Sequence, residues 1–269
     1  MTPDAPAAVN QAPRTPLAAW LAMPEPLVVE MAARAGFDWI GLDLQHGAWD
    51  LGTAFRAIQL CDALGKPVVV RLPDEQLPLI PRVLDHGSSG IVLAMASDPA
   101  VVAAAVERAR YQPEGLRSYG GQRYGLRPEP RDLREVRPAI FPMIETRRGF
   151  EALDEIASIE GIGGLHIGPV DLGLGLRLGR DTTSAAFREA VARIVETGHR
   201  RRLPVTMHAV GAGEAAAWVG MGIDELVLTA DVELLRTAFS RVLEGARQAL
   251  GAGGQPAFPA AGGGYGTSS

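Results

Sequence analysis

The sequence predicts a (β/α)8 TIM barrel, and three observations support that prediction. Short apolar runs alternate with helical patterns along the chain, and eight of these runs have the length of a strand. The runs are continuously apolar, which is typical of a parallel sheet covered on both faces. The chain has 269 residues and is 47% hydrophobic, which suits one such barrel with a full core. An open doubly wound sheet is the alternative, but no G-x-G-x-x-G motif follows an early strand.

Eight strands are expected in chain order. They are residues 17–22, 39–43, 67–71, 90–94, 140–145, 163–167, 204–208 and 225–229. Helices are expected between them, for example over 25–36, 51–65 and 100–110, where apolar residues recur at i, i+3, i+4 spacing. Glycine or proline precedes several strands, which is typical of loops that end a helix and begin a strand. Residues 111–138 form a longer connection, rich in Gly, Tyr and Arg, that we expect to cover a site or contact another subunit.

One domain is expected over residues 16–249, with a flexible segment on each side. Residues 1–15 lack the apolar stretch of a secretory signal, and residues 250–269 are rich in Gly, Ala and Pro, which is typical of disorder. The single cysteine, Cys61, lies in an apolar helical stretch and excludes a disulfide within the chain. No run approaches 18 apolar residues. We therefore expect a cytoplasmic protein without a membrane partner.

The charge pattern argues against a nucleic-acid partner. The net charge is −5, and no basic cluster combines with exposed aromatic residues. The nearest candidate is the run HRRR over residues 199–202, which we interpret as a solvated corner between a helix and a strand.

Polar side chains collect at the predicted C-terminal ends of the strands, where barrels of this kind carry their chemistry. They are Trp20, Asp43, His46, Arg71, Glu145 and Asp171. Buried arginine and carboxylate groups are unfavourable unless they are paired or bind a metal. Two of them have a structural alternative, since Arg71 could pair with Glu145 or Asp171 and His46 could cap the next helix. A further candidate, Asp85 at a helix end, could be a solvated surface acid. Their joint placement at one end of the barrel favours a functional site.

Two of these acids, Glu145 and Asp171, predict a divalent cation. Placed together without a partner, they would repel, and one would be forced into the neutral form. Mg²⁺ or Mn²⁺ typically accepts one or two protein carboxylates and keeps its other positions for water and an oxygen-rich substrate. Zinc is disfavoured because the chain has no HxxxH, HxH or cysteine cluster. The chemistry indicated is metal activation of a small oxyacid, with Arg71 countering negative charge and His46 transferring a proton.

The position of the only lysine argues against a Schiff-base mechanism. Such a mechanism needs a lysine inside the barrel, near the C-terminal half of a strand. Lys66 precedes the third predicted strand, at the opposite end of the barrel.

Five segments together resemble the HpcH/HpaI family of class II pyruvate-dependent aldolases. They are GFDWIGLDLQHG (36–47), VVVRLP (68–73), LDHGSSGIVLAMA (84–96), MIETRRG (143–149) and GIGGLHIGPVDLGLGLR (161–177). They occur in the family's order within residues 17 to about 245. The resemblance implies a (β/α)8 barrel, an assembly into trimers or hexamers, and one Mg²⁺, Mn²⁺ or Co²⁺ ion.

The resemblance also implies a role for each candidate residue. Glu145 and Asp171 match the metal ligands, and Arg71 matches the arginine beside the enolate oxygen. His46 matches the catalytic base, and Asp85 matches the acid that pairs with it across a subunit or loop contact. Backbone amides around Gly168, Val170 and Asp171 would hold the substrate carboxylate, and Trp20 matches a residue of the substrate pocket.

Departures from the family pattern concern the substrate rather than the metal. Met143 stands where several of these aldolases carry glutamine, and Gln45 replaces an acid in the D-x-E-H pattern.

The function that the resemblance leads us to expect is reversible cleavage of a 4-hydroxy-2-oxo acid to pyruvate, or a related acid such as hydroxypyruvate, and an aldehyde. The alternatives are an oxaloacetate decarboxylase, a citrate-lyase-like CoA-ester lyase, or a protein that binds 2-oxo acids without catalysis.

Overall fold

A computed structural model of the chain describes residues 14–120, 122–123, 126, 133–209 and 212–251. The expected segments 1–15 and 250–269 therefore lie almost wholly outside the described residues, as does part of the connection over 111–138. The described chain divides into two units, one up to residue 232 and one from residue 233 onward. The first unit holds every strand of the structure.

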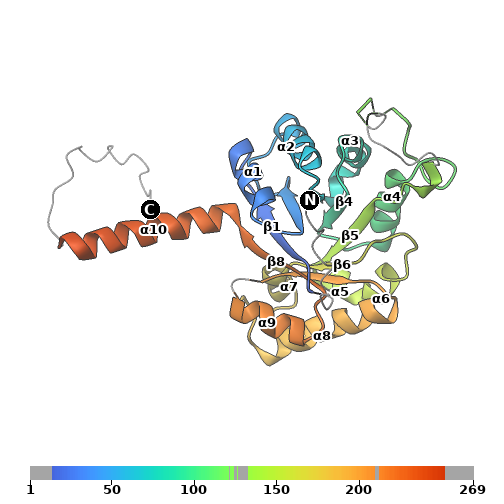
Figure 1. Cartoon of the computed structure of the whole chain (residues 1–269). Coiled ribbons are helices and arrows are strands. Elements are labelled where there is room, and N and C mark those ends of the chain that lie inside the picture. Colours follow the sequence, from blue (N-terminus) through green and yellow to red (C-terminus); the bar gives the residue numbers. More distant parts are fainter. Residues whose placement is uncertain (1–13, 121, 124–125, 127–132, 210–211, 252–269) are drawn as a thin grey trace, which may run out of the picture. The chain divides into compact units, whose positions relative to one another are not determined.

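Eight parallel strands close into a barrel in the order β1 to β8 (Figure 1). The strands are β1 (Leu17–Leu21), β2 (Trp39–Asp43), β3 (Val68–Pro73), β4 (Gly90–Ala94), β5 (Ala139–Ile144), β6 (Leu165–Ile167), β7 (Val205–His208) and β8 (Glu225–Ala230). Each pairs in parallel with its neighbours, and β1 pairs with β8 to complete the ring. The (β/α)8 prediction is confirmed, and the doubly wound alternative is wrong because the sheet has no open edge.

The predicted strand boundaries hold to within two residues. Two boundaries differ by two residues: β3 ends at Pro73 rather than at residue 71, and β6 begins at Leu165 rather than at residue 163. A side chain at Gly163 would lie 2.6 Å from the Ala139 Cβ, and one at Gly164 would lie 2.6 Å from the Pro204 carbonyl oxygen. These glycines therefore serve a close approach of the neighbouring chains rather than the ladder itself.

Helices alternate with the strands, and the helices of the first unit surround the barrel (Figure 1). They are α1 (Pro26–Arg34), α2 (Leu51–Ala63), the 3-10 helix η1 (Asp74–Leu79), α3 (Ile80–Asp85), α4 (Pro99–Ala109), the 3-10 helix η3 (Leu133–Glu135), α5 (Arg147–Glu151), α6 (Leu153–Ile156), α7 (Pro169–Gly175), α8 (Ala185–Arg200), α9 (Ala212–Gly220) and α10 (Asp231–Leu250). Several begin with a side-chain cap; in α2 the Asp50 carboxylate accepts the Thr53 N–H, and Thr53 reciprocates. None of the helices in the described part of the chain is both long and apolar enough to cross a bilayer.

Two apolar clusters stabilise the barrel. The larger one fills the layer between the strands and the helices and includes Ile40, Ile91, Phe187 and the buried Cys61. The smaller one lies within the ring of strands and contains Trp20, Val69, Val92 and Met143, among others. Apolar side chains thus pack both faces of the strands, as their continuous apolar sequences predict.

Candidate active site

A cavity of about 410 Å³ lies at the C-terminal ends of the strands. It is lined by Trp20, Asp43, Arg71, Met143, Gly168, Pro169, Val170, Asp171, Thr182, Met207, His208, Glu214 and Trp218. Five residues that the sequence singled out for binding or metal ligation, Trp20, Arg71, Gly168, Val170 and Asp171, therefore share one space. This agrees with the rule that the loops following barrel strands build the active site.

Glu145 is only 2% exposed, and its carboxylate lies against Gly168, which lines this cavity. It follows β5, and its Oε1 accepts the Met95 backbone N–H at 2.6 Å. The pKa of the Glu145 carboxyl is raised to about 7, mainly by burial and also by the negative charge of Asp171, while the Met95 hydrogen bond and the Arg71 charge act in the opposite direction. The two acids are thus close enough to disfavour each other's ionised form.

The pair Glu145 and Asp171 fits a hard divalent cation. Among the described residues no group of three or more His, Cys, Asp or Glu side chains is placed to hold a metal ion. Two carboxylates suffice for Mg²⁺ or Mn²⁺ when water and substrate oxygens supply the other ligands. A cation between them would also favour the ionised form that burial opposes.

Gly168 allows the backbone after β6 to approach Glu145 closely. A Cβ atom at this position would lie 2.3 Å from the Glu145 Oε2 and 2.9 Å from the Met143 Cε. Any side chain here would displace the carboxylate, so this glycine is part of the geometry of the acid pair. Asp171 lies in the first turn of α7, three residues further along the chain.

Arg71 pairs with Asp43, rather than with Glu145 or Asp171 as the structural alternative for this residue had it. Its Nε donates to Asp43 Oδ1 at 2.8 Å and its Nη2 to Asp43 Oδ2 at 2.5 Å. Both residues are buried, and β2 and β3 place them side by side in register. Burial raises the pKa of the Asp43 carboxyl, but the Arg71 hydrogen bond and charge outweigh burial and leave it below its usual value.

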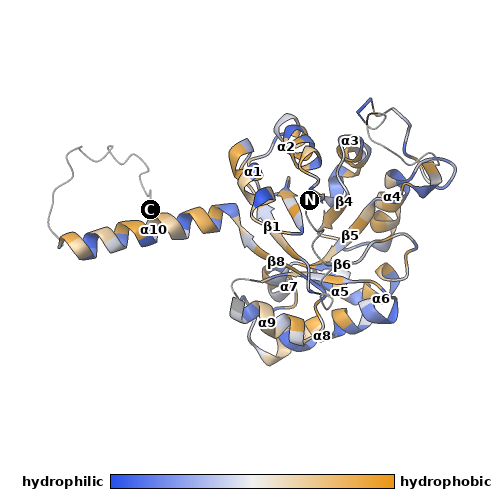
Figure 2. Cartoon of the chain, in the orientation of Figure 1, coloured by the Kyte–Doolittle hydropathy of each residue, from blue (hydrophilic) through white to orange (hydrophobic). Residues whose placement is uncertain are grey.

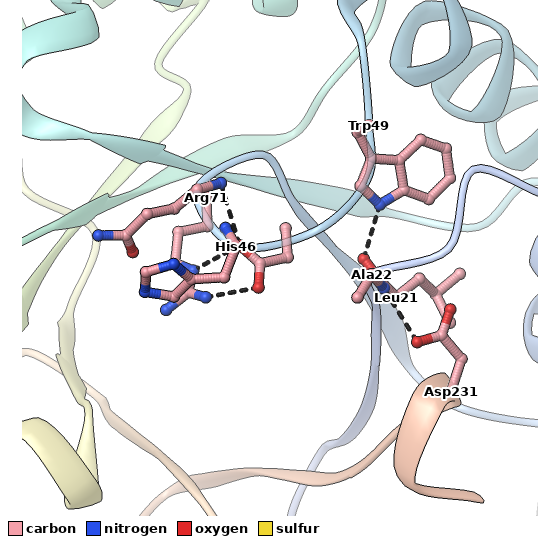
Figure 3. A network of polar contacts seen from close by, with 8 residues as sticks. Leu21, Ala22, His46, Trp49, Arg71 and Asp231 are labelled. Atoms are coloured by element: carbon pink, nitrogen blue, oxygen red, sulfur yellow. Dashed lines mark hydrogen bonds and ion pairs between the residues drawn. The ribbon is translucent and has the colours of Figure 1, made fainter. Parts of the chain in front are cut away.

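Asp43 also fixes the loop that carries His46. The Asp43 Oδ1 accepts the His46 backbone N–H at 3.0 Å and the Gln45 N–H at 3.1 Å. Figure 3 shows His46 and Arg71 in this network, beside the contacts of Leu21 with Trp49 and of Ala22 with Asp231. The His46 side chain is exposed, and Asp50 rather than His46 caps α2. The alternative that His46 is a helix cap is therefore wrong.

Asp85 is held in an ion pair with Arg117. It ends α3, and its Oδ1 accepts from Arg117 Nη2 at 2.6 Å and from Arg117 Nε at 3.1 Å. Arg117 belongs to the long connection after α4 and is 2% exposed, and its guanidinium lies 4.5 Å from the centre of the Tyr111 ring. Asp85 is therefore no solvated surface acid. Its pairing with His46 stays a prediction.

Lys66 lies at the N-terminal end of the barrel, as expected. Its ammonium group donates to the Phe37 carbonyl, and the strand β3 begins two residues later. A second cavity, of about 200 Å³, occupies the same end and is lined by Trp39, Val69, His166 and Glu225, among others. This second cavity contains none of the predicted site residues.

Two contributors to the site could not be singled out from the sequence. Met95 follows β4 and adopts a left-handed backbone, with φ of 54°, while its N–H donates to Glu145. Only a few per cent of non-glycine residues adopt such a conformation, and it often marks a functional position. His208 ends β7 and lines the cavity. Its position at a strand end was the one available sequence signal.

The chain matches the family described as HpcH/HpaI aldolase/citrate lyase over residues 17–225. This match covers well over half of the chain. The chain belongs to the HpcH/HpaI aldolase/citrate lyase family. It is therefore an enzyme of the aldolase and lyase type.

Known members of the HpcH/HpaI family resemble this chain over most of its length. A hydroxypyruvate/pyruvate aldolase of Rhizorhabdus wittichii is 32% identical over 238 residues, which are 87% of this chain and 95% of that protein. The crystal structure of an HpcH/HpaI family protein from Burkholderia cenocepacia is 27% identical, has a TM-score of 0.79, and covers 87% of this chain and 95% of its own. A citrate lyase beta subunit of M. tuberculosis, complexed with oxaloacetate and magnesium, shares the fold at 20% identity and a TM-score of 0.53, over 80% of this chain and 91% of its own.

Proposed function

We propose that the chain is a divalent-metal-dependent aldolase. It reversibly cleaves 4-hydroxy-2-oxo acids to pyruvate, or a related 2-oxo acid such as hydroxypyruvate, and an aldehyde. The observation that carries the proposal is that Asp171 and Arg71 line one cavity and that the charges of both act on the buried carboxyl of Glu145. The hydroxypyruvate/pyruvate aldolase of Rhizorhabdus wittichii supports the same substrate class.

Glu145 and Asp171 would hold the ion, which we propose to be Mg²⁺, Mn²⁺ or Co²⁺. When bound, the ion supplies Lewis-acid polarisation of the 2-oxo group. Backbone amides around Gly168 and Val170 would hold the substrate carboxylate, and Trp20 would form a wall of the pocket. All three of these residues line the cavity.

Arg71 would neutralise the negative charge that develops on the 2-oxo oxygen when the carbon–carbon bond breaks. Two of its five N–H groups are used by Asp43, which fixes the guanidinium plane and leaves the others for the substrate. Such a preorganised donor stabilises the transition state without reorganisation at the moment of reaction.

His46 would transfer the proton. In the cleavage direction it removes the proton of the 4-hydroxyl, the C3–C4 bond breaks, the aldehyde leaves, and the bonding electron pair remains on the 2-oxo acid fragment as an enolate. Protonation of C3 then gives the 2-oxo acid. Asp43 positions the His46 backbone, and Asp85 is proposed to assist His46 across a subunit contact.

Exchange of the pyruvate methyl protons with D₂O tests the core of this proposal. The wild-type protein with Mn²⁺ or Mg²⁺ should exchange the protons, followed by NMR, and treatment with EDTA should abolish the exchange. Full exchange after EDTA would show that the metal role is wrong. Binding of pyruvate without any exchange would instead support a 2-oxo-acid-binding protein.

Glu145→Gln and Asp171→Asn should each lower the exchange rate by about 10²-fold or more, because each removes a metal ligand and its electrostatic contribution. Glu155→Gln, at an exposed glutamate of α6, is the matched control and should retain the rate. Equal rates in all three variants would contradict the assignment of the ligands.

A second reaction, decarboxylation of oxaloacetate or cleavage of a CoA ester, is the alternative at the same site. The citrate lyase beta subunit of M. tuberculosis binds oxaloacetate and magnesium, which supports this alternative reaction. Incubating the metal-loaded protein with oxaloacetate, and separately with a citramalyl-type CoA ester, distinguishes the reactions. A faster turnover of either compound than of 4-hydroxy-2-oxo acids would replace the aldolase proposal.

We further propose that the chain forms a homo-oligomer, a trimer or hexamer. Apolar residues recur along α10 at positions 232, 235, 239, 242, 243, 246 and 250, a spacing that places them on one side of the helix. Several are strongly exposed, including Phe239 at 71% and Val242 at 72%, and Figure 2 shows apolar residues along the length of α10. A helix with such an exposed apolar face is stabilised when a second copy covers it.

A further inference from the structure

His208 is a cavity residue without a part in the chemistry proposed above. It is the last residue of β7 and lines the cavity together with Arg71, Met143 and Asp171. Its Nε2 atom is buried and has no hydrogen-bond partner within the described chain. A buried polar atom in this situation is unfavourable unless a ligand supplies its partner.

Aromatic packing fixes the orientation of the His208 ring. The ring meets Trp20 edge-on, with 4.7 Å between the ring centres, and meets His166 at 5.1 Å in a second edge-on contact. Trp20 itself lies flat over Gly41, where a Cβ atom would come within 2.1 Å of its ring. The imidazole is therefore held in place before any ligand arrives, as a specific hydrogen-bonding group requires.

His208 is a neutral hydrogen-bonding group. The pKa of the His208 imidazole is lowered to about 4, mainly by burial and also by the Arg71 charge, while the Asp43 charge acts in the opposite direction. A neutral imidazole has one N–H donor and one acceptor nitrogen, so it suits a hydroxyl group, which can serve in either role. The negative charge on the 2-oxo oxygen of the substrate already has Arg71 as its proposed partner.

The depth of His208 favours contact with the 2-oxo acid rather than with the aldehyde. Trp20, Arg71 and Glu145 are all buried, and they mark the floor on which the acid would be held. The ladder pairs Met207 with Ile167, so His208 lies beside Gly168, the residue that packs against the Glu145 carboxylate.

We propose that His208 is a specificity-determining residue that hydrogen-bonds the C3 hydroxyl of a 3-hydroxy-2-oxo acid. The chain then selects hydroxypyruvate over pyruvate as the carbon nucleophile. This inference rests on the proposed aldolase function and names the donor for that site. Pyruvate, which has no C3 hydroxyl, leaves the buried Nε2 atom without a partner, and hydroxypyruvate satisfies it.

The test compares kcat/KM for the two donors with one aldehyde. His208→Leu should lower kcat/KM for hydroxypyruvate by about 10-fold and change that for pyruvate by less than about 3-fold, as loss of one hydrogen bond predicts. His208→Gln, whose amide nitrogen reaches the place of Nε2, should restore part of the preference. His166→Phe is the matched control. It removes the imidazole that packs against His208 but lines the second cavity, at the opposite end of the barrel.

Three outcomes would overturn the inference. They are equal losses for both donors in His208→Leu, the same change of preference in His166→Phe, and a loss that follows a hydroxyl on the aldehyde rather than on the acid. Calorimetric titration of the Mn²⁺-loaded protein with each acid gives a readout independent of turnover. If the wild type cleaves no hydroxy-oxo acid, the aldolase function fails, while weaker hydroxypyruvate binding in His208→Leu still supports the hydroxyl contact.

Discussion

Gly168 shows how one atom can control the acid pair. The space that a Cβ atom would need is occupied by the Glu145 Oε2 and the Met143 Cε. The backbone after β6 thus approaches the carboxylate more closely than any other residue type would allow. In the segment HIGPVDLG, Gly168 thus leaves the Glu145 carboxylate its place, which a side chain would disturb.

Gly168→Ala is expected to displace the Glu145 carboxylate and weaken Mn²⁺ binding by at least about 10-fold. The affinity can be measured by isothermal titration calorimetry. Gly220→Ala, at the exposed end of α9 with open space around its Cβ position, is the control and should bind Mn²⁺ as the wild type does. Unchanged affinity in Gly168→Ala would contradict the proposed ligand geometry.

Cys61 provides a test of the core at the scale of one thiol. Burial raises the pKa of the Cys61 thiol to about 11, so the group is protonated at pH 8 and its reactive thiolate form becomes abundant only near pH 11. We expect the native protein not to react with Ellman's reagent at pH 8, and the unfolded protein in guanidinium to release one equivalent of chromophore. Rapid reaction of the native protein would contradict the burial of α2 on the barrel.

Among the secondary-structure elements, the short helix α3 depends on a contact from a distant loop. The helix has six residues, and its last residue, Asp85, is bound by Arg117 from the connection after α4. A helix this short has little stability of its own, so tertiary contacts hold it. The loop therefore has a structural role in the described part of 111–138, whether or not it also contacts another subunit.

Asp85→Asn should lower the free energy of unfolding by about 2 kcal/mol, because it removes the charge that balances a buried guanidinium. Urea denaturation followed by circular dichroism measures the change. Asp154→Asn is the matched control, since Asp154 and Arg200 form an ion pair in which both side chains are more than half exposed, and such pairs contribute less than about 1 kcal/mol. Equal effects of the two substitutions would argue against a structural role for the Asp85–Arg117 pair.

At the scale of the whole molecule, α10 has an exposed apolar face that a second copy would cover. The barrel, residues 1–232, has its own closed sheet and core, whereas α10 carries strongly exposed side chains such as Phe239 and Val242. Exposed apolar surface of this kind is typical of a protein–protein contact. In such an assembly, the proposed pairing with His46 would place Asp85 of one copy near the site of another.

The double substitution Phe239→Glu and Val242→Glu is expected to shift the protein from an oligomer toward the monomer, because it places charges in the proposed contact. Size-exclusion chromatography with light scattering gives the mass in solution. Arg241→Glu, an exposed charged residue on the same helix, is the control for a change of charge alone. A monomeric wild type would contradict the assembly directly.

The sequence by itself determined the barrel, the order of its strands and the identity of the acids at their C-terminal ends. Local periodicity carries that information, and parallel strands bring their C-terminal ends to one edge whatever side chains they hold. Only the tertiary structure decided that Arg71 pairs with Asp43, that Arg117 holds Asp85, and that His208 has a buried nitrogen without a hydrogen-bond partner among the described residues. These pairings depend on distances across the barrel between residues far apart in the chain, and no local pattern in the sequence encodes such distances.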